Sequence, residues 1–151
     1  VMQNILLLLI FNIATTSFLY GQDISPGDKQ RKDIYFVIDK YSQAREKRDT
    51  ILLKSILTPD VDQLVSTGEW RNGIDASVKG MLHSSANSPG TRTLTIEKIR
   101  FLNSNNAIVD CKYELQNPDD TIRKMWSTFI VVSVQGIWKI SAIRNMLPTG
   151  Q

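Results

Sequence analysis

The sequence has 151 residues, which fits a single folded domain because two cores of half that size would each bury too little surface. Hydrophobic residues make up 42% and charged residues 22%, which excludes a disordered or fibrous chain. The 18 basic residues are interleaved with 15 acidic residues, so the net charge of +3 is not gathered into a basic face and nucleic-acid binding is not expected.

The first 22 residues differ from the rest of the chain. An unbroken apolar run covers residues 5–10, and the first charged side chain is Asp23. The apolar stretch that contains this run has about the length of the hydrophobic region of a secretory signal, becomes more polar at residues 15–17, and ends at small Gly21 before polar Gln22. We therefore expect a signal peptide at residues 1–22 and a secreted or periplasmic protein. An uncleaved membrane anchor is the alternative, because no basic residue precedes the run, and only then is membrane contact expected.

Cys111 is the only cysteine and His83 the only histidine of the sequence. A single cysteine excludes an intramolecular disulfide, and these two residues cannot form a zinc or iron site at familiar spacing. We therefore expect neither a metal nor another cofactor. His83 lies opposite the apolar stripe of its predicted helix, which favours a solvated side chain, and Cys111 is expected to pack as a small apolar group.

Three helices are predicted after a polar linker at residues 23–30. The first helix carries an apolar stripe at spacings of three and four, formed by Ile34, Val37, Ile38 and Tyr41. A second, shorter helix runs from Asp49, its N-cap, to Leu57, and Pro59 marks its end. A third helix begins at Asp75 and ends before the NSPG segment.

The period of the hydrophobic residues changes to two from Thr91 onward. This alternation predicts four strands, at residues 91–102, 106–116, 123–134 and 137–147. The first of them changes phase near Glu97, which indicates a bulge of the kind that curls a sheet. A further strand candidate lies at residues 61–66, followed by a turn or loop that carries Trp70. The sequence thus predicts an α+β fold, with three N-terminal helices packed on a strongly curved antiparallel sheet.

The last hairpin is predicted to turn at Gln135 and Gly136, which pairs residues whose numbers sum to 271. One face of this hairpin then carries Met125, Ser127, Phe129 and Val131 beside Trp138, Ile140, Ala142 and Arg144. The other face carries Trp126, Thr128, Ile130 and Val132, with Asn145 opposite. Both faces are rich in apolar groups, so we expect the second face to meet another copy of the chain and form a homodimer. A bulge would instead bring Asn145 to the first face.

Three segments together resemble the nuclear transport factor 2-like superfamily, and within it the SnoaL-like, SgcJ/EcaC group. They are GEWRNGIDA at 68–76, NNAIVDCKYEL at 105–115 and STFIVVSVQGIWKISAIRN at 127–145. The resemblance covers about residues 30–147, within a domain assigned to residues 31–151. It implies a cone-shaped, cystatin-like domain whose sheet wraps around a helix-lined pocket, commonly in a homodimer joined through the sheet. It does not imply one reaction.

No catalytic residue is assigned from the sequence. In relatives that isomerise steroids, the base is a carboxylate a few residues ahead of the glycine corresponding to Gly68, and here residues 65–67 hold no acid. Asp62 could replace that base only if its strand turned it inward. Asp39 and Asp110 are also available, but the pattern places Asp110 on a polar face, where an unperturbed carboxylate is the default. Metal-free isomerase or cyclase activity therefore stays open.

The function expected from the sequence is the binding of a small, largely apolar organic ligand. The predicted binding residues are Tyr41, Trp70, Tyr113, Ser127, Phe129, Trp138, Arg144 and Asn145. The aromatic residues would enclose the ligand, and Ser127 or Arg144 would orient one polar atom of it. Core packing is the competing role for Phe129 and Trp138. The competing function is a non-catalytic dimerisation or partner-docking module whose cavity is filled by its own side chains.

Overall fold

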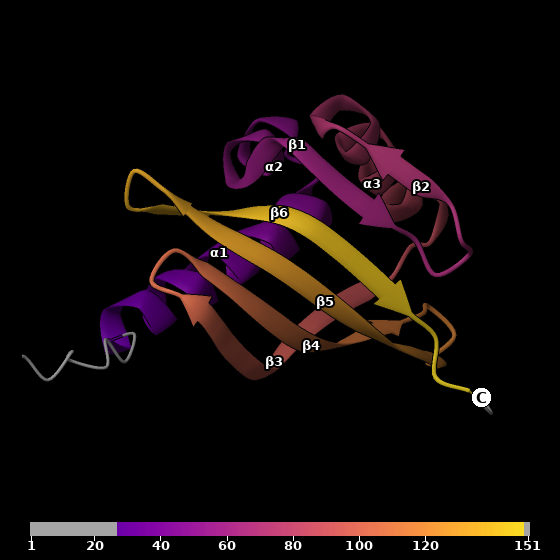
Figure 1. The fold of residues 1–151 in the computed structure, drawn as a ribbon. Coiled ribbons are helices and arrows are strands. Elements are labelled where there is room, and N and C mark those ends of the chain that lie inside the picture. Colours follow the sequence, from indigo (N-terminus) through magenta and orange to yellow (C-terminus); the bar gives the residue numbers. More distant parts are fainter. Residues whose placement is uncertain (1–26, 150–151) are drawn as a thin grey trace, which may run out of the picture.

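The computed structural model describes residues 27–149, which form three helices and a six-stranded sheet (Figure 1). The elements follow in the order α1 (Asp28–Lys47), α2 (Thr50–Ile56), β1 (Leu57–Leu64), β2 (Trp70–Asn72), α3 (Ile74–Asn87), β3 (Thr91–Asn103), β4 (Asn106–Gln116), β5 (Ile122–Val134) and β6 (Ile137–Met146). The predicted signal peptide at residues 1–22 lies outside the described residues and stays a prediction. Within residues 27–149, no helix is both long and apolar enough to cross a membrane.

The helices follow from their sequences, with one correction at the start of α1. This helix begins at Asp28, so the end of the predicted linker at residues 23–30 is helical. Asp28 favours helix there because its negative charge lies in the first turn, and Lys29 pairs with Asp33 one turn later at 2.6 Å. The predicted N-cap of α2 is confirmed, since the side chain of Asp49 accepts a hydrogen bond from the backbone N–H of Leu52.

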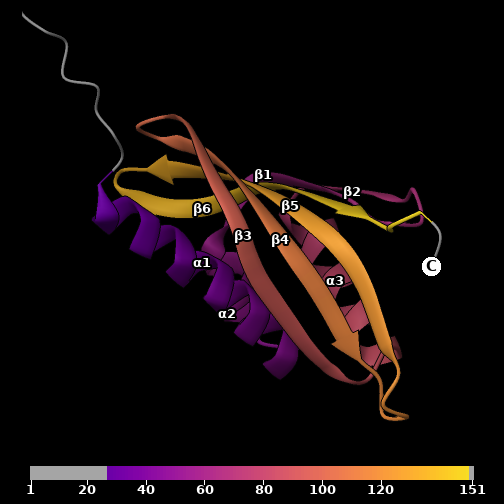
Figure 2. The ribbon, with the colours of Figure 1, turned by 90° about the horizontal axis from the view of Figure 1, so that it is seen from below.

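The sheet has the strand order β2-β1-β6-β5-β4-β3. The four strands predicted from Thr91 onward pair antiparallel as expected, and the one parallel pair of the sheet in residues 27–149 joins β1 to β6. The loop predicted around Trp70 instead contains the short strand β2, which pairs with β1. Three residues are too few to show a period of two, which is why the pattern missed this strand. Figure 2 shows the long strands β3, β4 and β5 curving past the helices.

The strand pairs β1–β6, β3–β4 and β5–β6 contain register shifts, and two of these shifts bear on the predictions. The predicted bulge in β3 is confirmed, because the pairing with β4 shifts register between Ile96 and Lys98. A second irregularity lies in the last hairpin, where pairs sum to 271 from the turn as far as Val131–Ile140 and to 272 from Ile130–Ala142 onward. The predicted register is therefore right near the turn and wrong beyond Ser141. Each later side chain of β6 consequently exchanges faces.

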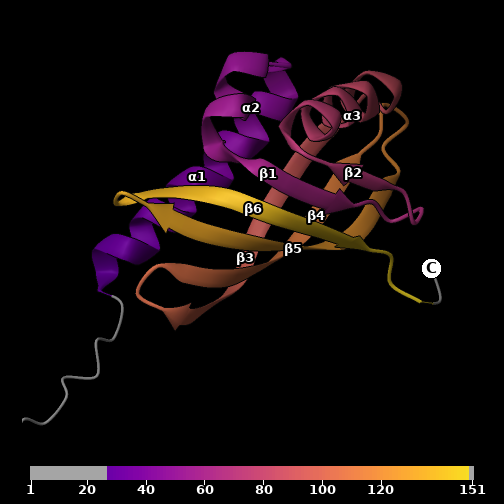
Figure 3. The same cartoon turned by 45° about the horizontal axis from the view of Figure 1, so that its top comes forward.

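All three helices lie on one side of the sheet, as Figure 3 shows, and the core fills the space between them. Tyr41 of α1 and Phe129 of β5 meet there edge to face, with ring centroids 5.2 Å apart. Trp138 packs against Phe101 in the same way at 6.1 Å. These contacts fill the centre of the cone, so open space remains towards its ends.

Candidate ligand-binding site

A cavity of about 260 Å³ lies at the end of the cone where α1 and α3 terminate. The β1–β2 loop, the start of β3 and β5 and the ends of β4 and β6 complete its wall. Two other depressions have volumes of about 350 and 380 Å³, but their walls hold fewer polar groups that converge on one space. Ligand sites combine a hollow with a small number of placed polar groups, so the first cavity is the candidate site.

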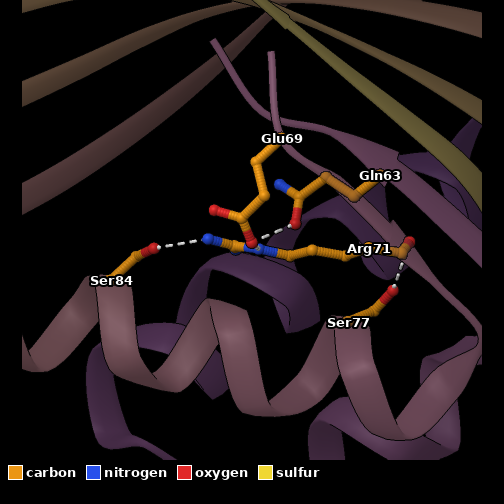
Figure 4. A network of polar contacts seen from close by, with 5 residues as sticks. All are labelled: Gln63, Glu69, Arg71, Ser77 and Ser84. Carbon is orange, nitrogen blue, oxygen red and sulfur yellow. Dashed lines mark hydrogen bonds and ion pairs between the residues drawn. The ribbon is translucent and has the colours of Figure 1, made fainter. Parts of the chain in front are cut away.

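Arg71 of β2 is the centre of a polar network in this cavity (Figure 4). Its side chain lies across α3, only 8% exposed, and its three guanidinium nitrogens each donate one hydrogen bond. Nε donates to Glu69 at 3.0 Å, Nη1 to Gln63 at 3.2 Å and Nη2 to Ser84 at 3.2 Å. The Oγ of Ser77 donates to the backbone carbonyl of Arg71 and ties the strand to the helix. This guanidinium is therefore held rigidly and is paired with one carboxylate.

Three further arginines line the same cavity, and none of them forms an ion pair within residues 27–149. Arg45 lies in the last turn of α1 and is 7% exposed. Arg92, at the start of β3, donates to the backbone carbonyls of Ser88 and Gly90. Arg123, at the start of β5, is exposed and donates to Ser66 at 3.4 Å. With Glu69 as the one acidic residue of the wall, the cavity carries a net positive charge.

The opposite part of the wall is apolar. Tyr113 and Leu115 of β4 and Met125 of β5 form a small buried cluster beside the main core, and all three line the cavity. Asn145 of β6 lines it as well and accepts a hydrogen bond from Ser127 at 3.1 Å. The cavity thus presents an apolar surface facing cationic and hydroxyl groups, so it suits a molecule with one polar and one apolar part.

The eight residues predicted to bind a ligand are not brought together. Tyr113 and Asn145 line the cavity, and the bulge at Ser141 is what turns Asn145 inward. Ser127 is buried beside Asn145 on the neighbouring strand, and Tyr41 and Phe129 are buried in the core. Trp138 lies towards the other end of the cone, where it lines a depression between α1, α2 and the β5–β6 turn. Core packing is the role that the geometry gives to Phe129 and Trp138.

Trp70 and Arg144 lie on the outer face of the sheet and not at the cavity. The guanidinium carbon of Arg144 lies 4.8 Å from the ring centroid of Trp70, and its Nη1 donates to Asp62 at 2.6 Å. The register shift in β6 is the physical reason, because it exchanges the faces of Arg144 and Asn145. Of the five aromatic residues predicted to enclose a ligand, Tyr113 is the one that lines this cavity.

The four arginines of the wall were not predicted from the sequence. A signal existed for Arg45, which continues the apolar stripe of Ile34, Ile38 and Tyr41 at the spacing of a helix and is buried with it. Arg71 lies on a strand too short to show a period, and nothing in the pattern distinguishes Arg92 or Arg123 from surface arginines.

No carboxylate in the described part of the chain has the environment of a general base. Asp39 is exposed, and Asp62 and Asp110 lie on the outer face, where they accept hydrogen bonds from Arg144 and Thr128. Glu69 is 58% exposed and paired with Arg71. Among residues 27–149, no group of three or more acidic, histidine or cysteine side chains could hold a metal ion.

The two residues singled out for their reactivity are placed differently. His83 is exposed, as predicted, but lies at the rim of the cavity with a ring nitrogen 2.7 Å from the side-chain nitrogen of Asn87. Cys111 is fully buried in the core, which confirms its apolar packing. Burial, with smaller contributions from the charges of Asp110 and Glu97, raises the pKa of the Cys111 thiol to about 12. The thiol therefore stays protonated and poorly nucleophilic at neutral pH.

The architecture defines a class of protein, the α+β cone whose curved sheet closes over helices. Solved structures identify the fold: an NTF2-like protein of unknown function from Shewanella oneidensis has 19% identity and a TM-score of 0.66, covering 78% of this chain and 98% of that chain. A cystatin-like domain from Nostoc punctiforme has 14% identity and a TM-score of 0.72, covering 81% and 79%. An NTF2-like protein from Novosphingobium aromaticivorans has 14% identity and a TM-score of 0.70, covering 82% and 84%.

The chain therefore has the nuclear transport factor 2-like, cystatin-like fold that the sequence resemblance predicted. At these identities the likeness concerns the fold alone, and the SnoaL-like, SgcJ/EcaC group stays a prediction. No protein-family model and no curated protein matches the sequence.

Proposed function

We propose that the protein binds a small organic molecule in the cavity between α3, the β1–β2 loop and the ends of β4 and β6. The observation that carries this proposal is the convergence of buried, hydrogen-bonded polar groups on an open space of about 260 Å³. A protein that used the fold only as a scaffold would gain stability by filling that space with apolar side chains. The proposal keeps the secreted or periplasmic location expected from residues 1–22.

The wall of the cavity supports a ligand that is less apolar than the one predicted from the sequence. Its polar side is formed by Arg71, Ser84 and Asn145, and its apolar side by Leu115 and Met125. Isomerase or cyclase activity gains no support, because the one carboxylate that residues 27–149 contribute to the cavity, that of Glu69, is 58% exposed and paired with Arg71.

Blocking the cavity should abolish fragment binding. In a screen of small organic fragments by amide chemical shifts, we expect bound fragments to perturb β2, the second half of α3 and the end of β6. Asn87→Trp places a large ring at the rim, where Asn87 is exposed, and should remove these perturbations. Ala86→Trp is the matched control, because Ala86 is exposed on the same helix and does not line the cavity. Fragments that bind both variants equally would contradict the proposal.

A second candidate function is homodimerisation through the outer face of the sheet, the face of Trp126, Thr128, Ile130 and Val132. Trp126 is 37% exposed there, and Ile130 and Val132 are half-buried in the single chain. Trp70 and Met146, 52% and 49% exposed, extend the same apolar surface. Exposed apolar surface of this kind is normally buried in an interface, and we propose that a second copy of the chain buries it.

Trp126→Glu should convert a dimer into a monomer, because it buries a carboxylate at the centre of the proposed interface. Light scattering after size-exclusion chromatography should give twice the chain mass for the unaltered protein and the chain mass for the variant. Ile51→Glu is the control, since Ile51 is 84% exposed on α2, away from this face, and should leave the mass unchanged. An unaltered protein that stays monomeric at all concentrations would overturn this proposal.

A further inference from the structure

Arg45 is a buried charge without a counterion. It is 7% exposed, lines the cavity from the end of α1 and has no acidic side chain within ion-pair distance among residues 27–149. Its one hydrogen bond in that range runs from Nη1 to the hydroxyl of Tyr41 at 3.3 Å, and its buried Nε has no partner there. Buried arginines are almost always paired, so this arrangement requires an explanation.

The end of α1 does not supply the missing negative charge. The last turn of a helix presents free carbonyl groups that favour a cation. Here the backbone N–H of Asp49 donates to the carbonyl of Ala44 at 2.8 Å, and that of Arg48 donates to the carbonyl of Arg45. The carbonyls of Ala44 and Arg45 are thus already bonded to the backbone. The ring centroids of Tyr41 and Tyr113 lie 5.7 and 6.0 Å from the guanidinium carbon, so the nearest groups are aromatic faces and not carboxylates.

Two other arginines of the cavity wall also lack an acidic partner within residues 27–149. Arg92 also has a buried Nε without a partner within residues 27–149, and its terminal nitrogens bond only to backbone carbonyls. Arg123 adds a third unpaired cation at the rim. Glu69 neutralises Arg71 alone. A group that supplied negative charge inside the cavity would therefore compensate side chains contributed by α1, β3 and β5.

We propose that the ligand is a small organic anion whose carboxylate pairs with Arg45, and this inference rests on the proposed function. Nη1 is the one side-chain nitrogen of Arg45 with a hydrogen bond among residues 27–149, and a carboxylate is the group whose two oxygens match the paired donors of a guanidinium. The apolar part of the ligand lies against Tyr113, Leu115 and Met125. The volume of about 260 Å³ limits the ligand to a fragment-sized acid.

Three probes of one shape and different charge test the inference: benzoate, benzamide and benzamidine, which are anionic, neutral and cationic at neutral pH. Titrations followed by amide chemical shifts should show benzoate binding at least about tenfold more tightly than benzamide, as expected when a desolvated guanidinium gains a carboxylate. Benzamidine should not bind. Inorganic phosphate, which lacks the apolar part, should bind more weakly than benzoate.

Two substitutions test Arg45 itself. Arg45→Met keeps the volume and removes the charge, so benzoate should lose its preference over benzamide, while the ligand-free variant should unfold at the same or a higher temperature. Arg45→Lys keeps the charge and removes the planar pair of donors, so it should weaken benzoate binding about tenfold or more. Arg100→Met is the control, because Arg100 is exposed on β3, does not line the cavity and should leave both readings unchanged.

The outcomes separate the two proposals. If benzamide binds in the cavity as tightly as benzoate, the inference that the ligand is an anion is wrong, while the proposed binding function stands. No shifts with any fragment would overturn the binding function. A lower unfolding temperature of Arg45→Met together with unchanged benzoate binding would show that Arg45 is structural and would overturn its role. If phosphate binds as tightly as benzoate, the apolar wall does not contribute to the affinity and that part of the inference is wrong.

Discussion

Phe129→Ala should lower the free energy of unfolding by about 3–5 kcal/mol, a large part of the stability of a domain of this size. Phe129 is fully buried at the centre of the sheet, with Val109 and Ile143 opposite on the neighbouring strands. Its ring meets that of Tyr41 edge to face, which joins the sheet to α1. Truncation removes the transfer free energy of the ring, opens a void that the neighbouring strands cannot close, and breaks this aromatic pair.

Urea denaturation at fixed protein concentration measures the change, since a dimer would make stability depend on concentration. Phe36→Ala is the control: the same deletion on α1 removes a ring that is 61% exposed, with Lys40 over its face at 4.3 Å. The control should cost less than about 1 kcal/mol. A loss below about 1 kcal/mol for Phe129→Ala would mean that α1 does not close on the sheet as described.

Most of the fold could be predicted because it follows from periodicity. The stripe of α1 and the alternation in β3 to β6 are long segments, and each forces one face against the core. The features that were not predicted correctly extend over only one to three residues. The strand β2 is too short to carry a pattern, and the bulge at Ser141 adds a single residue to β6.

That single extra residue explains why two of the predicted binding residues were assigned to the wrong face of the sheet. An alternating pattern predicts which side chains share a face only as far as the next bulge, beyond which every residue changes sides. Arg144 was therefore predicted inside and lies outside, while Asn145 moved the other way. The arginines of the cavity were missed for a different reason, because charged residues are assigned to the surface by default and burial of Arg45 and Arg71 is a property of the tertiary structure.

Gly80→Ala should destabilise the protein by about 2 kcal/mol although alanine is the better helix former, since the loss of bonds to a charged group outweighs about 1 kcal/mol of helix propensity. Gly80 lies in α3 directly under Arg71, and a Cβ at this position would overlap the Nε, Cδ and Cζ atoms of that side chain. Arg71 cannot simply move aside, because Gln63, Glu69 and Ser84 hold its three nitrogens. Displacement would also leave the side chain of Gln63, 2% exposed, without this partner.

A double-mutant cycle makes this prediction specific, because the sign of the effect should reverse. In an Arg71→Ala background the space above α3 is free, so Gly80→Ala should stabilise the protein by about 0.5–1 kcal/mol through helix propensity alone. The coupling between the two positions should therefore be about 3 kcal/mol, at the upper end of values for residues in contact.

Lys79→Ala supplies the baseline for this cycle. Lys79 is the neighbouring residue of α3, is exposed and takes no part in the hydrogen bonds of the network, so its coupling to Arg71→Ala should stay within about 0.5 kcal/mol. If Gly80→Ala had the same effect with and without Arg71, the guanidinium could not lie across the helix. The one arginine of the cavity that is paired with a carboxylate would then be free to turn towards solvent, and the polar side of the proposed binding site would lose its fixed part.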